Sequence, residues 1–273
     1  MLLRLAFGFA LMTALLVHPH EGAAQDLLRY VDLNSPDMST SEMTRAEVDA
    51  LLKAAPQGGS DQHPADLEGK RLSHLDLSGL DFSGSNLRLA KLNRTSLKGA
   101  RLDRAILNQA WMIDADLTEA SLVKASLLST QMQRAKLNGA DLSGARITGD
   151  LSGASLTGAK LAGADLSADM RNQSMGLMRG VLKSADLKNA DLSGANLSRA
   201  DLEFTKLQNA NLSNCNLNHA YLAGADLTNA NLAGADLTEA DLTSTLLPGA
   251  AALAEARNLD KAFNLNRARR PQN

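Results

Sequence analysis

The feature that most constrains this chain is a five-residue repeat that runs from Ala65 to Leu247. Each unit is centred on leucine, or rarely on another apolar residue such as Phe82 or Ile147, and a small residue, usually alanine, lies two positions before the centre. Asp, Asn, Ser, Thr, Lys, Arg and Gly occupy the positions in between. The segment AGADLTNANLAGADLTEADL, which begins at Ala223, is a regular example. Self-similarity at a short fixed period indicates a solenoid.

A period of five residues matches neither regular element. On an α-helix the leucines would spiral around all sides, and on a β-strand they would alternate between the two faces. The leucine and the small residue can both point to a common axis if the chain turns through a right angle in every unit. Four units then close one square coil, and successive coils stack at the inter-strand spacing of roughly 4.8 Å.

With its A(D/N)LXX signature, this segment resembles the pentapeptide repeat family, over about two thirds of the chain. The resemblance implies a right-handed quadrilateral β-helix. We therefore predict an all-β solenoid of about nine coils, roughly 40 Å long, with short helical caps at both ends. Its interior would be a ladder of leucines, with alanines at corners where a larger side chain would force the coils apart.

Residues 1–24 have the pattern of a signal peptide. Arg4 precedes an apolar run from Leu5 to Val17, which is too short to span a bilayer, and small residues lie before Gln25. We predict cleavage after Ala24. The mature protein would then be periplasmic or secreted and would have no membrane span.

The segments that flank the repeat, residues 25–64 and 248–273, are predicted to cap it. Terminal coils of a solenoid expose apolar surface and unpaired strand edges, which a cap covers. In the N-terminal segment, Thr44 and Glu47 form a capping box that opens a helix. In the C-terminal segment, AALAEARNLDKAF is helix-like, and Arg267, Arg269 and Arg270 belong to a frayed basic tail. The sequence leaves open whether the C-terminal helix makes a homodimer.

The repeat of residues 65–247 is irregular at 147–151 and at 167–181. One residue is missing between Ile147 and Leu151, and the frame is lost between Ser167 and Val181. In this second segment, either Met170 is a repeat centre followed by two bulged residues, or Met170 itself leaves the coil. Loops on regular scaffolds often carry binding residues, so this segment is a candidate surface as well as an interruption.

No motif for catalysis is found in the chain. It lacks GxSxG, HExxH, Walker and CxxC patterns, and its five His residues are scattered or lie in the leader. The many Asp and Ser residues occupy solvent-facing positions of the repeat, and Cys215 occupies a small inward position. A filled rod also offers no concave pocket. We predict a protein that is not an enzyme and that has no cofactor or metal site.

Apolar side chains at outward positions are the strongest candidates for a binding surface. Leu89, Ile106 and Leu128 are predicted to lie on one face in adjacent coils, and Trp111 and Ile113 flank Met112 just round the corner. The basic residues that would rim this patch are Arg71, Lys91, Arg94 and Arg134. This composition is typical of a protein-binding surface, although scattered exposed apolar residues are also normal on any protein.

Two functions follow from the family resemblance. Cytoplasmic members mimic DNA and occupy a topoisomerase, which requires dense negative charge, whereas the net charge here is only −2 and basic residues predominate between Lys70 and Arg104. Other members are exported. We predict an exported, non-catalytic scaffold that binds another protein, not nucleic acid, through its outer faces, with the DNA-mimicking topoisomerase-binding protein as the alternative.

Overall fold

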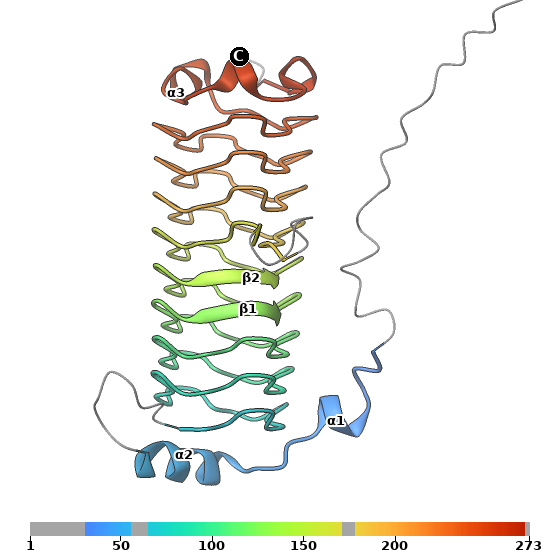
Figure 1. Ribbon diagram of the computed structural model, residues 1–273, viewed down its shortest axis with the longest axis vertical. Helices are drawn as coiled ribbons and strands as arrows, with labels where there is room; N and C mark the ends of the chain where they lie inside the picture. Colours follow the sequence, from blue (N-terminus) through green and yellow to red (C-terminus); the bar gives the residue numbers. More distant parts are fainter. Residues whose placement is uncertain (1–30, 56–64, 171–177, 271–273) are drawn as a thin grey trace, which may run out of the picture. The chain divides into compact units, whose positions relative to one another are not determined.

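The computed structural model describes residues 31–55, 65–170 and 178–270, and the account below concerns one compact unit, Asp32–Asn273. The predicted signal peptide lies outside the described residues. Between terminal helices the chain forms a right-handed, four-sided β-helix (Figure 1). The elements are α1 (Pro36–Ser39), α2 (Arg45–Ala54), β1 (Ser126–Gln131), β2 (Arg146–Asp150), α3 (Ala250–Ala254) and two 3-10 helices, η3 (Leu259–Lys261) and η4 (Leu265–Arg267).

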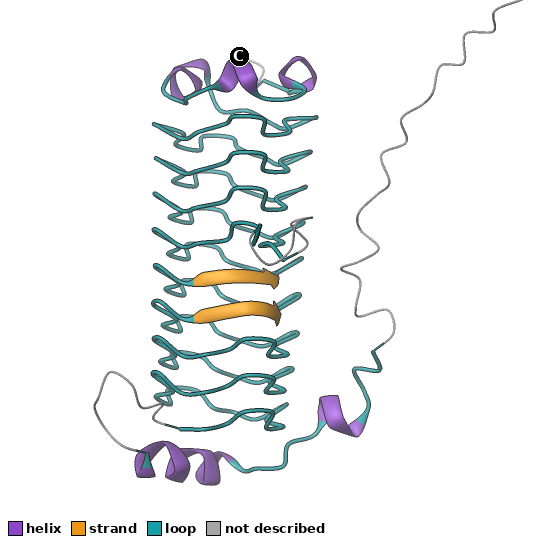
Figure 2. Ribbon diagram, in the orientation of Figure 1, coloured by secondary structure: helices purple, strands orange, loops and turns teal. Residues whose placement is uncertain are grey.

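Each side of a coil pairs with the coils before and after it through single parallel bridges. For this reason most of the stack is drawn as loop in Figure 2, and only β1 and β2 pair over a longer stretch. The bridges form four columns, which we use to name the faces. Face A contains Asn86, Ile106 and Ser126; face B contains Lys91, Trp111 and Gln131; face C contains Ser96, Asp116 and Lys136; face D contains Arg101, Ser121 and Asp141.

The leucine ladder and the alanine corners fill the interior, as the repeat predicts. Leu107, Leu127 and Ala105 have no exposed surface, and the other leucine centres and the alanine corners from Ala90 to Ala240 are at most 1% exposed. The residue two positions after each centre turns the corner in the left-handed conformation, as at Asn189, where φ is 57°. Glycine and asparagine adopt this conformation at low cost, which explains why they are frequent there.

The missing residue at 147–151 is accommodated by straightening the chain. β2 pairs in parallel with β1, and the register shifts between Leu128 and Gln131. Gly149 occupies the inward corner, where a Cβ atom would lie 2.4 Å from the carbonyl oxygen of Thr130. Only glycine fits this shortened corner.

The second irregularity is an excursion from the coil. The chain leaves the ladder after Ala168, whose N–H still donates to Ser198, and returns at Gly180, whose N–H donates to the carbonyl of Leu166. Met170 is 45% exposed. Of the two threadings that the sequence allows, the one in which Met170 leaves the coil is therefore correct. The tip of the excursion, residues 171–177, lies outside the described residues.

At the N-terminal end, α2 packs across the first coil. The Thr44 side chain accepts from the N–H of Glu47, whose carboxylate accepts from the N–H of Thr44 in return. Val48 and Leu52 are buried in the same core cluster as the first leucines of the ladder. Residues Leu33–Thr40, which include α1 and are here called the strap, contact face B, where Asn93 donates to the carbonyl of Met38.

At the C-terminal end the ladder continues as one wider coil with helical corners. Asp236 pairs with Arg257, Asp241 with Phe263, and Leu246 with Arg269. The single helix expected in this segment is instead the five-residue α3 followed by η3 and η4. The expectation of a frayed tail is wrong for Arg269, because its backbone is hydrogen-bonded on both sides, to Leu247 and Thr245. None of the helices that the structure describes is long and apolar enough to cross a membrane.

Candidate functional site

Among the described residues, hollows lie under the strap and at the C-terminal end. The space under the strap is about 10 Å³, and the recess at the C-terminal end is about 390 Å³ and is lined by residues that include Leu253, Leu259 and Arg270. In the described part of the chain, no group of three or more His, Cys, Asp or Glu side chains could hold a metal ion. Candidate binding chemistry therefore lies on the outer faces.

Most of the predicted apolar patch lies at the corner between faces A and B. Ile106 and Leu128 are half-buried on face A, where the N–H of Leu128 donates to Oδ1 of Asn108 at 3.1 Å. Leu89 turns the corner one coil earlier and is 41% exposed. Trp111 begins the adjoining side on face B and is half-buried. Leu89, then Ile106 and Trp111, then Leu128 lie on three consecutive coils, with Ile106 at the start of face A and Leu89 at its end.

Leu89 is in an unfavourable backbone conformation. Its φ is 58°, in the left-handed region, where a side chain with a Cβ atom costs about 1–2 kcal/mol. Equivalent corners carry glycine at Gly69, Gly79 and Gly99. The same left-handed conformation recurs at other non-glycine corners, among them Arg94, Arg104 and Gln109, so what distinguishes Leu89 is its exposed apolar side chain.

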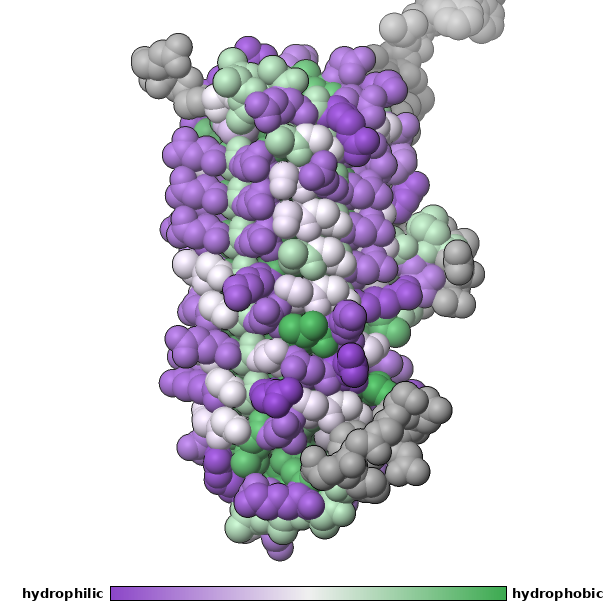
Figure 3. Space-filling model, turned by 90° about the vertical axis from the view of Figure 1, so that its left-hand side faces the viewer, coloured by the Kyte–Doolittle hydropathy of each residue, from purple (hydrophilic) through white to green (hydrophobic). Residues whose placement is uncertain are grey.

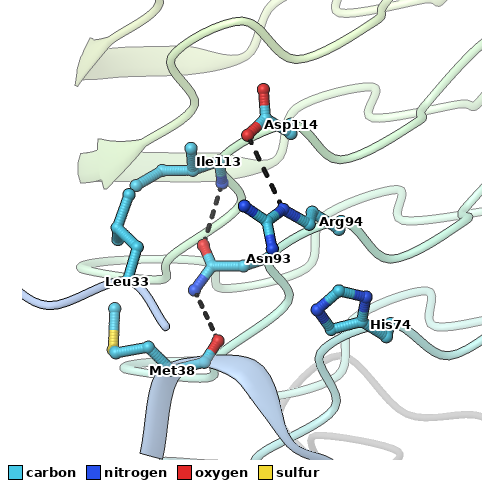
Figure 4. Close-up of a pocket in the computed structure, with 7 residues that line it drawn as sticks. All are labelled: Leu33, Met38, His74, Asn93, Arg94, Ile113 and Asp114. Carbon is cyan, nitrogen blue, oxygen red and sulfur yellow. Dashed lines mark hydrogen bonds and ion pairs between the residues drawn. The ribbon is translucent and has the colours of Figure 1, made fainter. Parts of the chain in front are cut away.

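Ile113 does not belong to the exposed patch, and the prediction that it faces solvent is wrong. The side chain is 1% exposed because the strap covers it. Figure 4 shows Leu33 beside Ile113. Asn93 lies between Ile113 above it and Met38 below it. The residues that line the space under the strap are Leu33, Met38, His74, Asn93, Arg94, Ile113 and Asp114. The contact joins positions far apart in sequence, so no local pattern could have indicated it.

The predicted basic rim is also largely occupied by contacts within the chain. Lys91 pairs with Asp37 at 3.4 Å and Arg71 with Glu42 at 3.4 Å, so both hold the segment that contains and follows the strap. Arg94 approaches Asp114 at 4.0 Å.

Arg134 makes the strongest contact of the rim. It donates twice to the carboxylate of Asp114, at 2.8 Å each, and this hydrogen bonding raises the pKa of Arg134. Because these cations already have acidic partners, their role as a free rim is not supported by the geometry.

Basic residues predominate at the N-terminal end of the repeat and acidic ones between Asp226 and Asp241, and residues of the flanking segments contact both groups. At the basic end, Glu42 pairs with Lys70 and Arg71. At the acidic end, Asn258 donates to Asp236 at 2.9 Å. This bond, with help from Thr238 and the charge of Arg257, lowers the pKa of Asp236 to about 2. On the face seen in Figure 3, hydrophilic side chains predominate and the hydrophobic areas are small.

Two exposed aromatic residues were not among the predicted site residues. Phe204 is 56% exposed at the corner after face B, with φ of 56°, and Phe263 is 51% exposed in the C-terminal coil. The outward repeat position of Phe204 was a usable signal, whereas Phe263 lies beyond the repeat. The ring of Phe204 lies over Gly224, where a Cβ atom would meet it at 2.6 Å, and Lys183 lies 5.8 Å from its centre.

Cys215 is a core residue of the ladder. It is fully buried, its thiol donates to the carbonyl of Leu192 at 2.9 Å, and burial raises its pKa to about 12. A thiol in this state is not a nucleophile near neutral pH.

Comparison with known proteins identifies the repeat. The family model described as "Pentapeptide repeats" matches residues 65–109, 112–149, 150–168, 181–214 and 205–244. No curated protein sequence matches the chain.

Among solved structures, the chain is similar to HetL, a pentapeptide repeat protein involved in heterocyst differentiation regulation in the cyanobacterium Nostoc sp. strain PCC 7120. The identity is 33%, the match covers 74% of this chain and 81% of HetL, and the TM-score is 0.55. Full-length QnrB1, a plasmid-mediated fluoroquinolone resistance protein, matches at 15% identity over 76% of this chain and 92% of QnrB1, with a TM-score of 0.47.

Proposed function

Because the chain belongs to the pentapeptide repeat family, whose members are generally non-catalytic structural or interaction modules, we propose that it is an exported scaffold that binds another protein. HetL, the similar cyanobacterial protein, takes part in regulation. A regulatory role without an enzymatic site is most simply exercised by binding. The proposal assigns the binding to the outer faces of the β-helix.

The observation that carries this proposal is the large apolar side chain of Leu89, 41% exposed at the edge of an apolar group. Leu89, Ile106 and Leu128 lie along face A, and Trp111 at the start of face B, on three consecutive coils. Aromatic and branched apolar side chains at the centre of an interface supply most of its binding energy. We call these four residues the corner patch.

The outer faces support a second function, the mimicry of DNA, less well than they support a scaffold. Such a surface would display rows of unpaired carboxylates, but on face C the column runs Asp186, Lys206, Asp226, and Lys206 lies 3.9 Å from Asp186. Asp226 accepts from both the N–H and the hydroxyl of Thr228, so its carboxylate is engaged in its own turn. Mixed and internally bonded carboxylates are poor imitations of a phosphate backbone.

Capture of the partner tests the proposal. The mature chain is used to capture proteins from a periplasmic extract, alongside the variants Leu89→Asn and Phe204→Asn. Both positions have φ near 57° and an exposed bulky residue, but Phe204 lies outside the corner patch. A specific partner should be lost with Leu89→Asn, by about thirtyfold for a contribution near 2 kcal/mol, and kept with Phe204→Asn. Equal capture by both variants would contradict the corner patch.

Export is proposed from the pattern of residues 1–24. The native protein should begin at Gln25 when its mass is measured, and it should be found outside the cytoplasm. An intact N-terminus would contradict export and would favour the DNA-mimicking alternative.

The homodimer through the C-terminal end is a separate proposal. The recess beside α3 is lined by Leu253 and Leu259, and a second copy would cover this apolar surface. Light scattering of the purified chain should give twice the monomer mass, and Leu259→Asp should restore the monomer. A monomeric mass for the unaltered chain at micromolar concentration would dismiss this dimer.

A further inference from the structure

The strap is held on face B by a set of side chains that recognise a peptide backbone. The carbonyl oxygen of Met38 accepts from Oγ of Ser73 at 2.9 Å and from Nδ2 of Asn93 at 3.1 Å. Ser73 and Asn93 are almost completely buried, at 1% and 5% exposure. Two side-chain donors from consecutive coils therefore converge on one backbone acceptor of a segment that is not part of the ladder.

Asn93 uses a bonding arrangement that recurs elsewhere in the β-helix. Its Oδ1 accepts from the N–H of Ile113 in the next coil at 3.0 Å, just as Oδ1 of Asn138 accepts from the N–H of Thr157 at 3.1 Å on face C. This bond fixes the amide so that its NH₂ group points outward. At Asn93 the outward donor meets the Met38 carbonyl, as Figure 4 shows.

Apolar and charged contacts complete this surface, which is made by Ser73, Lys91, Asn93 and Ile113 and which we call the seat. Met38 is 6% exposed and Ile113 is 1% exposed, and the space left between them and Leu33 is only about 10 Å³. The carboxylate of Asp37, the residue before Met38, lies 3.4 Å from Nζ of Lys91. A hollow of this size admits side-chain atoms of a peptide but no separate ligand.

The strap is weakly fixed apart from this seat. The following segment is anchored to the first coil, where Ser41 pairs with Leu72 and the N–H of Glu42 donates to Arg71 at 3.0 Å. By contrast, Asp37 is 62% exposed, and an ion pair that exposed adds little. The anchor at Ser41 is thus made by contacts separate from those that hold Leu33 to Met38 on face B.

We propose that the seat on face B, made by Ser73, Lys91, Asn93 and Ile113, is a peptide-binding site and that the strap is its resident, displaceable ligand. The partner is a protein segment with the chemistry of the strap. It carries an acidic residue directly before a large apolar residue, as in Asp37-Met38, and a second apolar residue five positions earlier, as Leu33 is. The proposal rests on the proposed function, since it names a second contact by which a protein partner is held.

The test uses the full chain and a labelled synthetic peptide, VDLNSPDMST, which is the sequence of residues 31–40. In the variant Met38→Ser the strap should lose its anchor and open the seat. The peptide should then bind at least about tenfold more tightly than to the unaltered chain, measured by fluorescence anisotropy, because a tethered competitor acts at an effective concentration near millimolar. A peptide with Asp in place of its Met should not bind.

Two further variants identify the seat. Adding Asn93→Ala to Met38→Ser should weaken peptide binding at least about tenfold, because the donor to the peptide carbonyl is lost. Adding Asn138→Ala, which removes an equivalent inter-coil bond on face C, should leave peptide binding unchanged. Failure of the peptide to bind a folded Met38→Ser chain, or equal binding with and without Asn93, would overturn the proposal. So would exchange of straps between two copies, seen as a dimer of the Met38→Ser chain, because the occupant would then be a second copy.

Hydrogen exchange on the unaltered chain keeps the test decisive if Met38→Ser does not fold. The N–H groups of Met38 and Ser39 donate to the carbonyl of Ser35. Excess peptide should speed exchange at these two positions while Ile113 stays protected. No change at saturating peptide would refute displacement. Capture through the corner patch is measured separately with Leu89→Asn, so the two proposals can fail independently.

Discussion

Among glycine-to-alanine substitutions at the described positions, Gly149→Ala is expected to destabilise the β-helix most. The new Cβ atom would lie 2.4 Å from the carbonyl oxygen of Thr130 and 3.1 Å from its nitrogen. These are backbone atoms of the neighbouring coil, so the clash cannot be relieved by a side-chain rotation. Overpacking of a core costs about 1–3 kcal/mol, and a clash with backbone belongs at the upper end of that range.

For a domain of this size, 1 kcal/mol corresponds to about 2–4 °C in melting temperature, so Gly149→Ala should lower it by roughly 6–12 °C. Gly249→Ala is the matched control, because a Cβ atom there would meet nothing within 4 Å and the backbone is not in the left-handed region. Its melting temperature should stay within about 2 °C of the unaltered chain. Thermal unfolding followed by circular dichroism measures both. An equal melting temperature for Gly149→Ala would refute the register of β1 and β2.

Further predictions concern other positions. Ala230→Leu should unfold or shorten the stack, since this corner is 1% exposed, and a melting curve like that of the unaltered chain would refute the square-coil packing. Leu89→Gly should raise the free energy of unfolding by up to about 1 kcal/mol in urea titrations, because the left-handed strain is relieved. The folded-state pKa of Asp236, about 2, lies below its ordinary value of 3.8, so its stabilising contribution is full above about pH 4 and is lost as the pH falls towards 2. Urea unfolding of the unaltered chain should show this loss, and Asp236→Asn should reduce it. Cys215 should resist alkylation at pH 8 in the native chain and react after denaturation, as mass spectrometry would show.

The coil itself could be predicted because its signal is local. A leucine every five residues and an alanine two positions before it specify both what is buried and where the chain turns, and the ladder follows from repetition. The coil and face of each outward residue could be predicted for the same reason, since residues twenty apart in the regular repeat lie on adjacent coils. The frame loss at Ser167 was visible, but only the bonds of Ala168 and Gly180 distinguish its two threadings.

What the sequence did not indicate comes from contacts that bridge the repeat and its flanks. Ile113 occupies an outward position of the repeat, and nothing within a few residues of it signals that Met38 will cover it. Likewise, the C-terminal segment has a helix-like composition, yet Arg257 and Arg269 extend the ladder because the last coil presents unpaired backbone groups. In the first case an exposed apolar side chain is covered by a distant segment, and in the second an unpaired coil edge is hydrogen-bonded by one. The free energy of these contacts outweighs the local conformational preference of the segments.

Site-specific photo-crosslinking in the living cell tests most directly whether this protein acts by binding a partner at the corner patch. A photoreactive amino acid at Leu128, half-buried on face A, should form an adduct with a distinct protein, whereas the same group at Asn189, at an exposed corner between faces C and D, should form none. Equal adducts at both positions, or none at Leu128, would contradict a binding site at this corner of the β-helix.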